Sequence, residues 1–216
     1  MSLKSQIDAY NVQKEAKLPS DVLALMAQTN EELIAQHIKD NALQVGAKVS
    51  NFSLNNHSAE QVELADLLNN GPVIISFYRG NWCPYCNLEL KALNDHLPEF
   101  KTHNAQLVAI SPQLPDETLS SAQKNALEFD VLSDINNKVA EQFGLLFTLD
   151  ERIVALYSQF GIDFEKYYGN KSYKLPLPAT YVINQKGIIT YAFLNEDYTL
   201  RAEPTDVLAA LESEQH

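Results

Sequence analysis

The sequence predicts an α/β fold, a central mixed β-sheet flanked by helices, with a helical extension at the N-terminus. Apolar, β-branched runs at residues 73–78 and 107–110 are typical of buried strands. Helical patterns alternate with such runs along the middle of the chain, which indicates βαβ units and mostly parallel strands. A turn at residues 185–187 separates two later runs and predicts an antiparallel hairpin.

Residues 1–44 form the predicted extension, and residues 45–216 the predicted main domain. Leu18-Pro19-Ser20 ends one helical segment, and Ser20 is a candidate N-cap for the next. Thr29 is followed by Glu32 at the spacing of a capping box, which predicts that a further helix begins there. We expect the extension either to cover the main domain or to form the subunit contact of a homodimer.

The elements of the main domain follow one another with short connections. Pro98 predicts a kink at the end of the helix that begins at Cys83. In chain order we expect an extended arm at 46–54, a helical turn at 63–68, a strand at 73–78, a helix at 83–97, a strand at 107–110, a helix at 115–125, a strand at 129–132, a helix at 137–143, an aromatic-rich insertion at 144–176, a hairpin at 178–193 and a closing helix at 204–212.

The charge balance narrows the range of partners. The formal net charge is −12, so no basic face is predicted that would bind nucleic acid or an anionic membrane. The first 17 residues lack the apolar run of a signal peptide, and no stretch is long enough to span a bilayer. We therefore expect a cytoplasmic protein.

Cys83 and Cys86 are the only cysteines, and they form a C-x-x-C motif directly after the first buried strand. At the start of a helix the backbone amides lack intrahelical partners and the helix dipole is positive, so a thiolate is stabilised there. Such cysteines are reactive near neutral pH. Pro84 fits the first helical turn, where no N–H is needed. The motif predicts a dithiol that closes and reopens as a disulfide.

Two other interpretations of the motif are an inert buried pair and a zinc site. Zinc requires four ligands, and the downstream candidates His96 and His103 do not have compact zinc-finger spacing. We therefore expect redox chemistry with no metal and no other cofactor.

The stretch FYRGNWCPYCNLEL resembles the peroxiredoxin-like branch of the alkyl hydroperoxide reductase and thiol-specific antioxidant family. The resemblance extends over about residues 45–212 and implies a thioredoxin-like fold. It also implies that Cys83 attacks the oxidant, that Cys86 is the second cysteine, and that Pro178 is the cis-proline facing them. The sequence departs from typical members at two positions, Ser76 and Gly80, where these carry a proline and a threonine.

Three further side chains are candidates for supporting roles. Arg79 either holds the Cys83 thiolate or is a solvated turn residue. Trp82 either shields the sulfur and docks partners or simply packs. By resemblance Arg201 reaches the cysteines; the alternative is a surface ion pair with Glu196 or Asp197.

These observations predict a thiol-dependent peroxidase that reduces hydroperoxides, and disulfides as well, through a Cys83–Cys86 cycle. Electrons would come from a thioredoxin- or glutathione-type donor. One alternative is a protein disulfide reductase without peroxidase activity. Another is a non-enzymatic scaffold that senses redox state or binds zinc.

Overall fold

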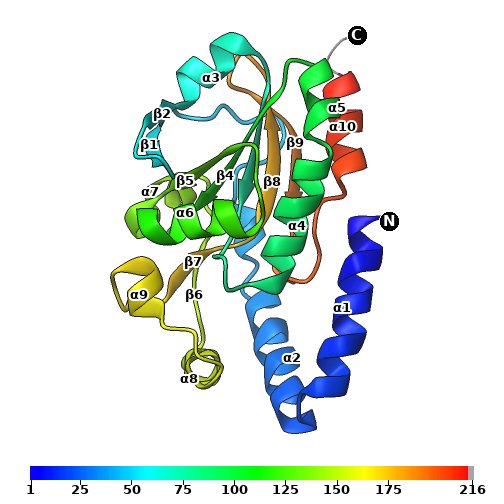
Figure 1. The fold of residues 1–216 in the computed structure, drawn as a ribbon, viewed down its shortest axis with the longest axis vertical. Helices are drawn as coiled ribbons and strands as arrows, with labels where there is room; N and C mark the ends of the chain where they lie inside the picture. Colours follow the sequence, from blue (N-terminus) through cyan, green and yellow to red (C-terminus); the bar gives the residue numbers. More distant parts are fainter. Residues whose placement is uncertain (214–216) are drawn as a thin grey trace.

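The computed structural model describes residues 1–213 and has a seven-stranded mixed sheet at its centre (Figure 1). The strand order is β2-β1-β5-β4-β3-β8-β9; β3, β4 and β5 are parallel, and β8 pairs antiparallel with β3 and β9. The strands are β1 (Ser53–Asn56), β2 (Gln61–Glu63), β3 (Val73–Phe77), β4 (Gln106–Ser111), β5 (Asp130–Ser133), β8 (Ala179–Ile183) and β9 (Ile189–Leu194).

Helices cover both faces of this sheet. The α-helices are α1 (Leu3–Lys17), α2 (Ser20–Ile34), α3 (Leu64–Asn70), α4 (Pro84–Asp95), α5 (Leu97–Thr102), α6 (Pro115–Lys124), α7 (Lys138–Gln142), α8 (Glu151–Gln159), α9 (Phe164–Tyr168) and α10 (Pro204–Ser213). Two 3₁₀ turns, η1 (Ile38–Asn41) and η2 (Ile135–Asn137), lie between them. The α/β architecture with a flanked mixed sheet and N-terminal helices is as predicted.

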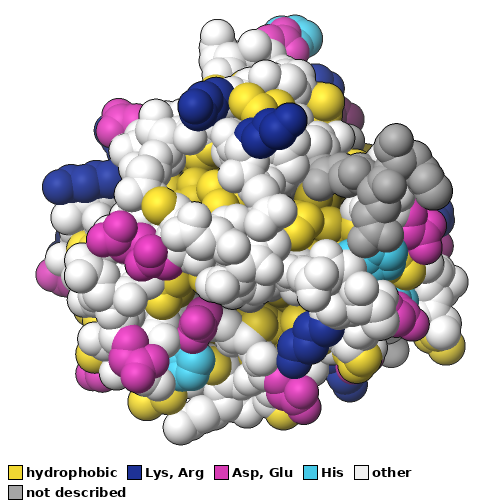
Figure 2. Space-filling model, turned by 90° about the horizontal axis from the view of Figure 1, so that it is seen from above, with side chains coloured by type: hydrophobic (Ala, Val, Ile, Leu, Met, Phe, Trp, Pro, Cys, Tyr) yellow, Lys and Arg dark blue, Asp and Glu magenta, His cyan; other side chains and the backbone are white. Residues whose placement is uncertain are grey.

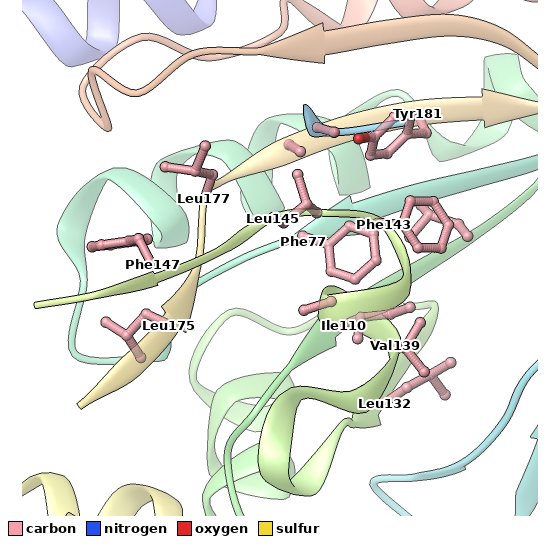
Figure 3. Packing of buried hydrophobic residues seen from close by; sticks show 14 of the residues in the cluster. Phe77, Ile110, Leu132, Val139, Phe143, Leu145, Phe147, Leu175, Leu177 and Tyr181 are labelled. Atoms are coloured by element: carbon pink, nitrogen blue, oxygen red, sulfur yellow. The ribbon is translucent and has the colours of Figure 1, made fainter. Parts of the chain in front are cut away.

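Side chains alternate along β3 between two apolar cores. Val73, Ile75 and Phe77 point into one core, together with residues of α7 and α8 and of the small sheet formed by β6 (Leu146–Thr148) and β7 (Lys174–Pro176) (Figure 3). Ile74 points the other way, into the core covered by α1, α4, α5 and α10. All five β3 residues are buried, as expected for a central strand with helices on both faces.

The helix predicted from Cys83 ends at Asp95, and a separate helix, α5, begins at Leu97. Pro98 lies in the first turn of α5, where its missing N–H costs nothing. The interruption predicted from Pro98 is therefore confirmed.

The capping box predicted at Thr29 is wrong, because α2 runs without a break from Ser20 to Ile34. The Thr29 hydroxyl donates to the carbonyl of Leu25, 2.9 Å away and one turn back, and so does not cap a helix start. Ser20 is not the N-cap either, since that position belongs to Pro19. The propensity signal at Thr29 was overridden by the continuous apolar face of α2.

The aromatic insertion contains β6, α8, α9 and β7. These elements lie at the same end of the molecule as the hairpin of α1 and α2 (Figure 1). The opposite end, seen in Figure 2, carries acidic and basic side chains scattered among uncharged ones. Across residues 1–213, no helix combines the length and apolarity needed to cross a membrane.

Candidate active site

The turn between β3 and α4 places the C-x-x-C motif at the start of a helix. Cys83 is the N-cap of α4, with an extended backbone, and Pro84 is in the first turn. The amide of Asn87 donates to the Cys83 carbonyl at 3.1 Å, which is the first bond of the helix. The amides of this first turn lack acceptors within the helix, and the positive end of the helix dipole favours negative charge there.

The Cys83 sulfur is fully buried and lies 3.1 Å from a guanidinium nitrogen of Arg79. Burial opposes ionisation of this thiol. The hydrogen bond from Cys86 and the charges of Arg79 and Arg201 outweigh it, and they hold the pKa of Cys83 well below its ordinary range. Arg79 itself is 3% exposed, so its interpretation as a solvated turn residue is wrong. The contact with Arg79 therefore favours the thiolate form of Cys83.

The surroundings of Cys86 favour its protonated form. Both cysteines are unbridged in the structure. Burial is the main cause that raises the pKa of Cys86 well above its ordinary range, and the hydrogen bond and negative charge of Cys83 add to it. Arg201 contacts the Cys86 sulfur at 3.6 Å and acts in the opposite direction. The pKa values of the two sulfurs are therefore shifted in opposite directions.

Arg201 lies in the interior, and the predicted surface ion pair with Glu196 or Asp197 is wrong. Its side chain is 1% exposed and pairs with Glu89, with the nitrogen and oxygen 2.6 Å apart. Glu196 pairs with Lys39 instead. The loop before α10 folds back over α4, so that the side chain of Arg201 reaches the cysteines.

Glu89 is a site residue that sequence reasoning missed, as are Tyr168 and Tyr198, which contact Arg79. Glu89 is 2% exposed, lies one turn after Cys86 on α4, and accepts hydrogen bonds from Arg201 and from the Thr180 hydroxyl at 2.9 Å. Burial raises its pKa, and the charge of Arg201 counteracts that shift. The available signal was a lone carboxylate three residues after a cysteine on an otherwise apolar helix face.

Aromatic rings pack around the Arg79 guanidinium. The Arg79 guanidinium lies 4.2 Å from the ring centre of Tyr198 and 5.2 Å from that of Trp82. Tyr198 also makes an edge contact with Tyr85, the third residue of the motif, at 5.5 Å. Cation–π contacts of this kind are strengthened by burial. The guanidinium and these rings leave neither sulfur exposed.

Trp82 occupies the space that a side chain at position 80 would need. A Cβ on Gly80 would lie 2.6 Å from the indole nitrogen, closer than real contacts allow. The indole nitrogen donates to the Tyr168 hydroxyl at 2.6 Å, and that hydroxyl donates to the Arg79 carbonyl at 2.7 Å. The absence of a threonine at position 80 is thus part of a different arrangement, in which Trp82 and Tyr168 hold the Arg79 backbone.

The prediction that Pro178 follows a cis peptide bond is wrong, because the peptide bonds among the described residues are all trans. Leu177 donates its amide to the Leu145 carbonyl at 2.8 Å, and the chain continues from β7 into β8. An X–Pro bond favours trans by about 0.5–1 kcal/mol, and this extended path does not require the turn that would reverse that preference.

Two cavities meet at Arg79. A small one of about 130 Å³ includes Glu32 and Asp150 in its lining. A larger one, of about 400 Å³, lies between α1, the end of α8 and the motif, and its lining includes Trp82, Pro84 and Tyr85. Arg79, Tyr157 and Tyr198 line both. Within residues 1–213, no three His, Cys, Asp or Glu side chains are grouped so as to hold a metal ion.

Comparison with known proteins gives consistent matches. Residues 45–192 match the model of the AhpC/TSA family. Peroxiredoxin Bcp of Escherichia coli (strain K12) is 33% identical over 105 residues, which are 49% of this chain and 67% of that protein. Chloroplastic peroxiredoxin Q of Triticum aestivum is 25% identical over 180 residues, or 83% of this chain and 72% of that one.

Solved structures of this kind share the fold. Peroxidoxin BcpB from Mycobacterium tuberculosis superposes with a TM-score of 0.62 at 23% identity, covering 79% of this chain and 97% of that one. Peroxiredoxin Q from Xanthomonas campestris superposes with a TM-score of 0.59 at 19% identity, covering 76% of this chain and 92% of that one.

Proposed function

Because this chain belongs to the AhpC/TSA family, we propose that Cys83 is the sulfur that attacks the oxidant and Cys86 the sulfur that resolves the product. The chain is a thiol-based oxidoreductase of the peroxiredoxin type, with the α/β fold of that group. The observation that carries the assignment is the contact of 3.1 Å between the Arg79 guanidinium and the buried Cys83 sulfur at the start of α4.

The proposed cycle has three steps. The Cys83 thiolate attacks the terminal oxygen of a hydroperoxide; the O–O bond breaks, the alkoxide takes a proton and leaves as an alcohol, and Cys83 becomes a sulfenic acid. The Cys86 thiol then attacks the Cys83 sulfur, forming the disulfide and releasing water. A thioredoxin- or glutathione-type thiol donor reduces the disulfide and restores both thiols.

The two arginines support different steps of the cycle. Among the described residues Arg79 has no carboxylate partner, so its full charge stabilises the thiolate and the alkoxide that forms near it. Arg201 is compensated by Glu89, which leaves Cys86 protonated until Cys83 has been oxidised. The order of the two sulfurs follows from this difference.

Stopped-flow oxidation of the reduced protein tests the proposal. Hydrogen peroxide or a small organic hydroperoxide should oxidise the wild type far faster than a free thiol, and Cys83→Ser should abolish the reaction. Cys86→Ser should still react once and then stop as a sulfenic acid, which dimedone traps. If Cys86→Ser fails to react while Cys83→Ser reacts normally, the two assignments are reversed.

A second candidate function is protein disulfide reduction without peroxidase activity. The observation in its favour is the arrangement at Gly80, where the Trp82 ring fills the place of the threonine found in typical peroxiredoxins. An insulin reduction assay on the same variants separates the two functions. Rapid insulin turnover with peroxide oxidation no faster than that of a free thiol would support the second.

We also propose a compartment and an assembly for this chain. We propose the cytoplasm, because the reduction of the dithiol by a donor requires a reducing compartment. A homodimer through α1 and α2 has some support from exposed apolar side chains there, including Val12 at 68% exposure. Sedimentation velocity at two protein concentrations tests the dimer, and a single species at the mass of 24.2 kDa would contradict it.

A further inference from the structure

The carbonyl of Arg79 is held by side chains and not by a strand or a helix. It lies in the turn between β3 and α4, and among the described residues its donors are the hydroxyls of Tyr168, at 2.7 Å, and Ser111, at 3.5 Å. The longer contact is at the limit of a hydrogen bond, so Tyr168 is the principal donor. The main chain of the residue that contacts Cys83 is therefore fixed by a hydroxyl that lies 89 positions away in the sequence.

Tyr168 reaches this turn from the aromatic insertion, where it is the last residue of α9. It is 5% exposed, and its ring stacks on that of Phe164 with 5.9 Å between the ring centres. Gly169 ends the helix in the left-handed conformation, at a φ of 69°, and the Leu114 amide donates to the Tyr167 carbonyl at 2.9 Å. These contacts on both sides of Tyr168 fix the position from which its hydroxyl acts.

The hydroxyl of Tyr168 also holds the indole ring of Trp82. An indole nitrogen can only donate, so at 2.6 Å it donates to the Tyr168 oxygen and directs the Tyr168 proton to the Arg79 carbonyl. Burial raises the pKa of Tyr168 well above its ordinary value, so the proton stays on the oxygen. The Trp82 ring in turn lies 5.2 Å from the Arg79 guanidinium. One hydroxyl thus holds the Arg79 carbonyl directly and, through Trp82, the surroundings of the guanidinium.

We propose that Tyr168 is a positioning residue, which holds the Arg79 guanidinium against the Cys83 sulfur through the Arg79 carbonyl and the Trp82 ring. The contact that it maintains is 3.1 Å long, and the attraction between opposite charges weakens as they move apart. Without the hydroxyl, Arg79 moves more freely, its mean distance from Cys83 increases and the thiolate loses stabilisation. The consequence for peroxide reduction rests on the proposed function; the placement of Arg79 does not.

The titration of Cys83 in the Cys86→Ser background tests this proposal. The charged and titratable groups with the largest effect on Cys83 are Arg79, Arg201 and Cys86. Arg201 makes its hydrogen bonds without Tyr168, so a change of midpoint in Tyr168→Phe reports on Arg79. Tyr168→Phe keeps the ring and removes the hydroxyl. The midpoint of the thiolate absorbance at 240 nm should rise by about 0.5–1 pH unit, the scale of one hydrogen bond.

A second background shows whether Tyr168 acts through Arg79. In Cys86→Ser/Arg79→Met the guanidinium is absent, so adding Tyr168→Phe should leave the midpoint where it is. A further rise there, equal to the rise in Cys86→Ser, would overturn the proposal. So would a Tyr168→Phe variant that unfolds more easily than the wild type but keeps the midpoint of Cys86→Ser, because a purely structural role has that effect.

Tyr167→Phe is the matched control, because Tyr167 is the neighbouring residue of α9 and its hydroxyl has no hydrogen bond to the described residues. It should leave the midpoint unchanged, and a rise equal to that of Tyr168→Phe would contradict the proposal. If circular dichroism shows that Tyr168→Phe does not fold, Trp82→Phe takes its place. This variant retains a ring and removes the donor that orients the Tyr168 hydroxyl, so the midpoint should rise; an unchanged midpoint would overturn the proposal.

The rate of oxidation by hydrogen peroxide separates this proposal from the proposed function. Below both midpoints the thiolate fraction falls tenfold for each pH unit by which the midpoint rises, so Tyr168→Phe should react about three- to tenfold more slowly than the wild type. If the wild type reacts rapidly and Tyr168→Phe reacts equally fast, the positioning role is wrong. If the midpoint rises as expected and the wild type reacts no faster than a free thiol, the proposed peroxidase function fails and the role of Tyr168 stands.

Discussion

At the scale of single residues, each of the two sulfurs has its own arginine, and the two arginines have different partners. Arg79 stacks on Tyr198 and contacts Cys83, whereas Arg201 is bound to Glu89 and contacts Cys86. A buried arginine that is not paired with a carboxylate lowers the pKa of a neighbouring thiol by its full charge, whereas an arginine paired with a carboxylate lowers it less. This difference makes two chemically identical side chains unequal.

The ionisation of Cys83 is the first prediction at this scale. In Cys86→Ser, thiolate absorbance at 240 nm should persist as the pH is lowered well below the ordinary thiol value of about 8.5, because the folded-state pKa is depressed. The stabilisation linked to this thiolate is present above the unfolded pKa and is lost as the pH falls through the folded one. Adding Arg79→Met should move the titration towards higher pH; an unchanged midpoint would contradict the role of Arg79.

Glu89 gives a second prediction. In Cys83→Ser/Glu89→Gln the pKa of Cys86 should be lower than in Cys83→Ser, because Arg201 is then uncompensated, and the titration at 240 nm measures it. Glu89→Gln should also cost about 3–5 kcal/mol in the free energy of unfolding, as removal of one partner of a buried ion pair does. A loss of stability with no change in the Cys86 midpoint would leave Glu89 with a structural role only.

Sequence patterns identified the motif residues but not their environment. Cys83, Cys86 and Arg79 are close in sequence, so the strand–turn–helix pattern already placed them together. Glu89 and Arg201 are 112 positions apart, and only the folding of the last loop onto α4 pairs them. Local sequence patterns cannot predict a contact between residues that are so far apart in the chain.

At the scale of elements, α1 is fastened across α4 at both of its ends. The Glu203 carboxylate accepts hydrogen bonds from the backbone amides of Leu3 and Lys4, at 3.1 and 2.6 Å. These bonds satisfy two of the amides that have no intrahelical partner at the start of α1. Near its other end, Asn11 and Lys14 hold the Tyr85 hydroxyl at 2.6 and 3.0 Å. The helix is thus tied directly to the C-x-x-C motif.

Removal of the Tyr85 hydroxyl should loosen that tie. Tyr85→Phe takes away two hydrogen bonds and leaves Asn11 and Lys14 to water, so we expect a loss of about 1–2 kcal/mol and faster hydrogen exchange in α1. Tyr191→Phe is the control, because that half-buried hydroxyl has no hydrogen bond to the described residues. Equal exchange of α1 in the two variants would show that the hydroxyl does not hold the helix.

The regular elements between residues 73 and 143 were predicted because apolar periodicity there is strong and unambiguous. The insertion at 144–176 was predicted only as aromatic-rich, since β6 and β7 have three residues each and pair across 25 intervening positions of helix and loop. Strands so short have no alternation to detect. Their pairing follows from the core that Phe147 and Leu175 enter (Figure 3).

At the scale of the whole molecule, the sheet separates two cores, and the site lies where the helices of both meet. Phe143 is fully buried in one of them, 4.8 Å from Phe77 and 5.1 Å from Tyr181 between ring centres. The N-terminal hairpin contributes to both cores, with Leu33 in one and Leu3 in the other. The sequence of the hairpin alone does not show that it enters both cores, because a helix that covers its own domain and a helix that forms a subunit contact have the same amphipathic pattern.

Unfolding experiments test whether these cores act together. Phe143→Ala should lower the free energy of unfolding by about 3–5 kcal/mol, as expected for an emptied ring site, and Phe160→Ala, 47% exposed, should lower it far less. Urea transitions followed by circular dichroism and by Trp82 emission should coincide if residues 1–44 and the main domain unfold as one unit. Two separate transitions would instead support independent domains.

Three contacts of the site come from one short stretch of chain. Tyr198 covers Arg79, Arg201 reaches Cys86, and Glu203 binds the start of α1, all within six positions between β9 and α10. Their spacing is fixed by backbone length, so one extra residue inserted in this stretch would displace at least one of them. Homologues and designed variants that retain this site should therefore differ here by substitution and not by insertion or deletion.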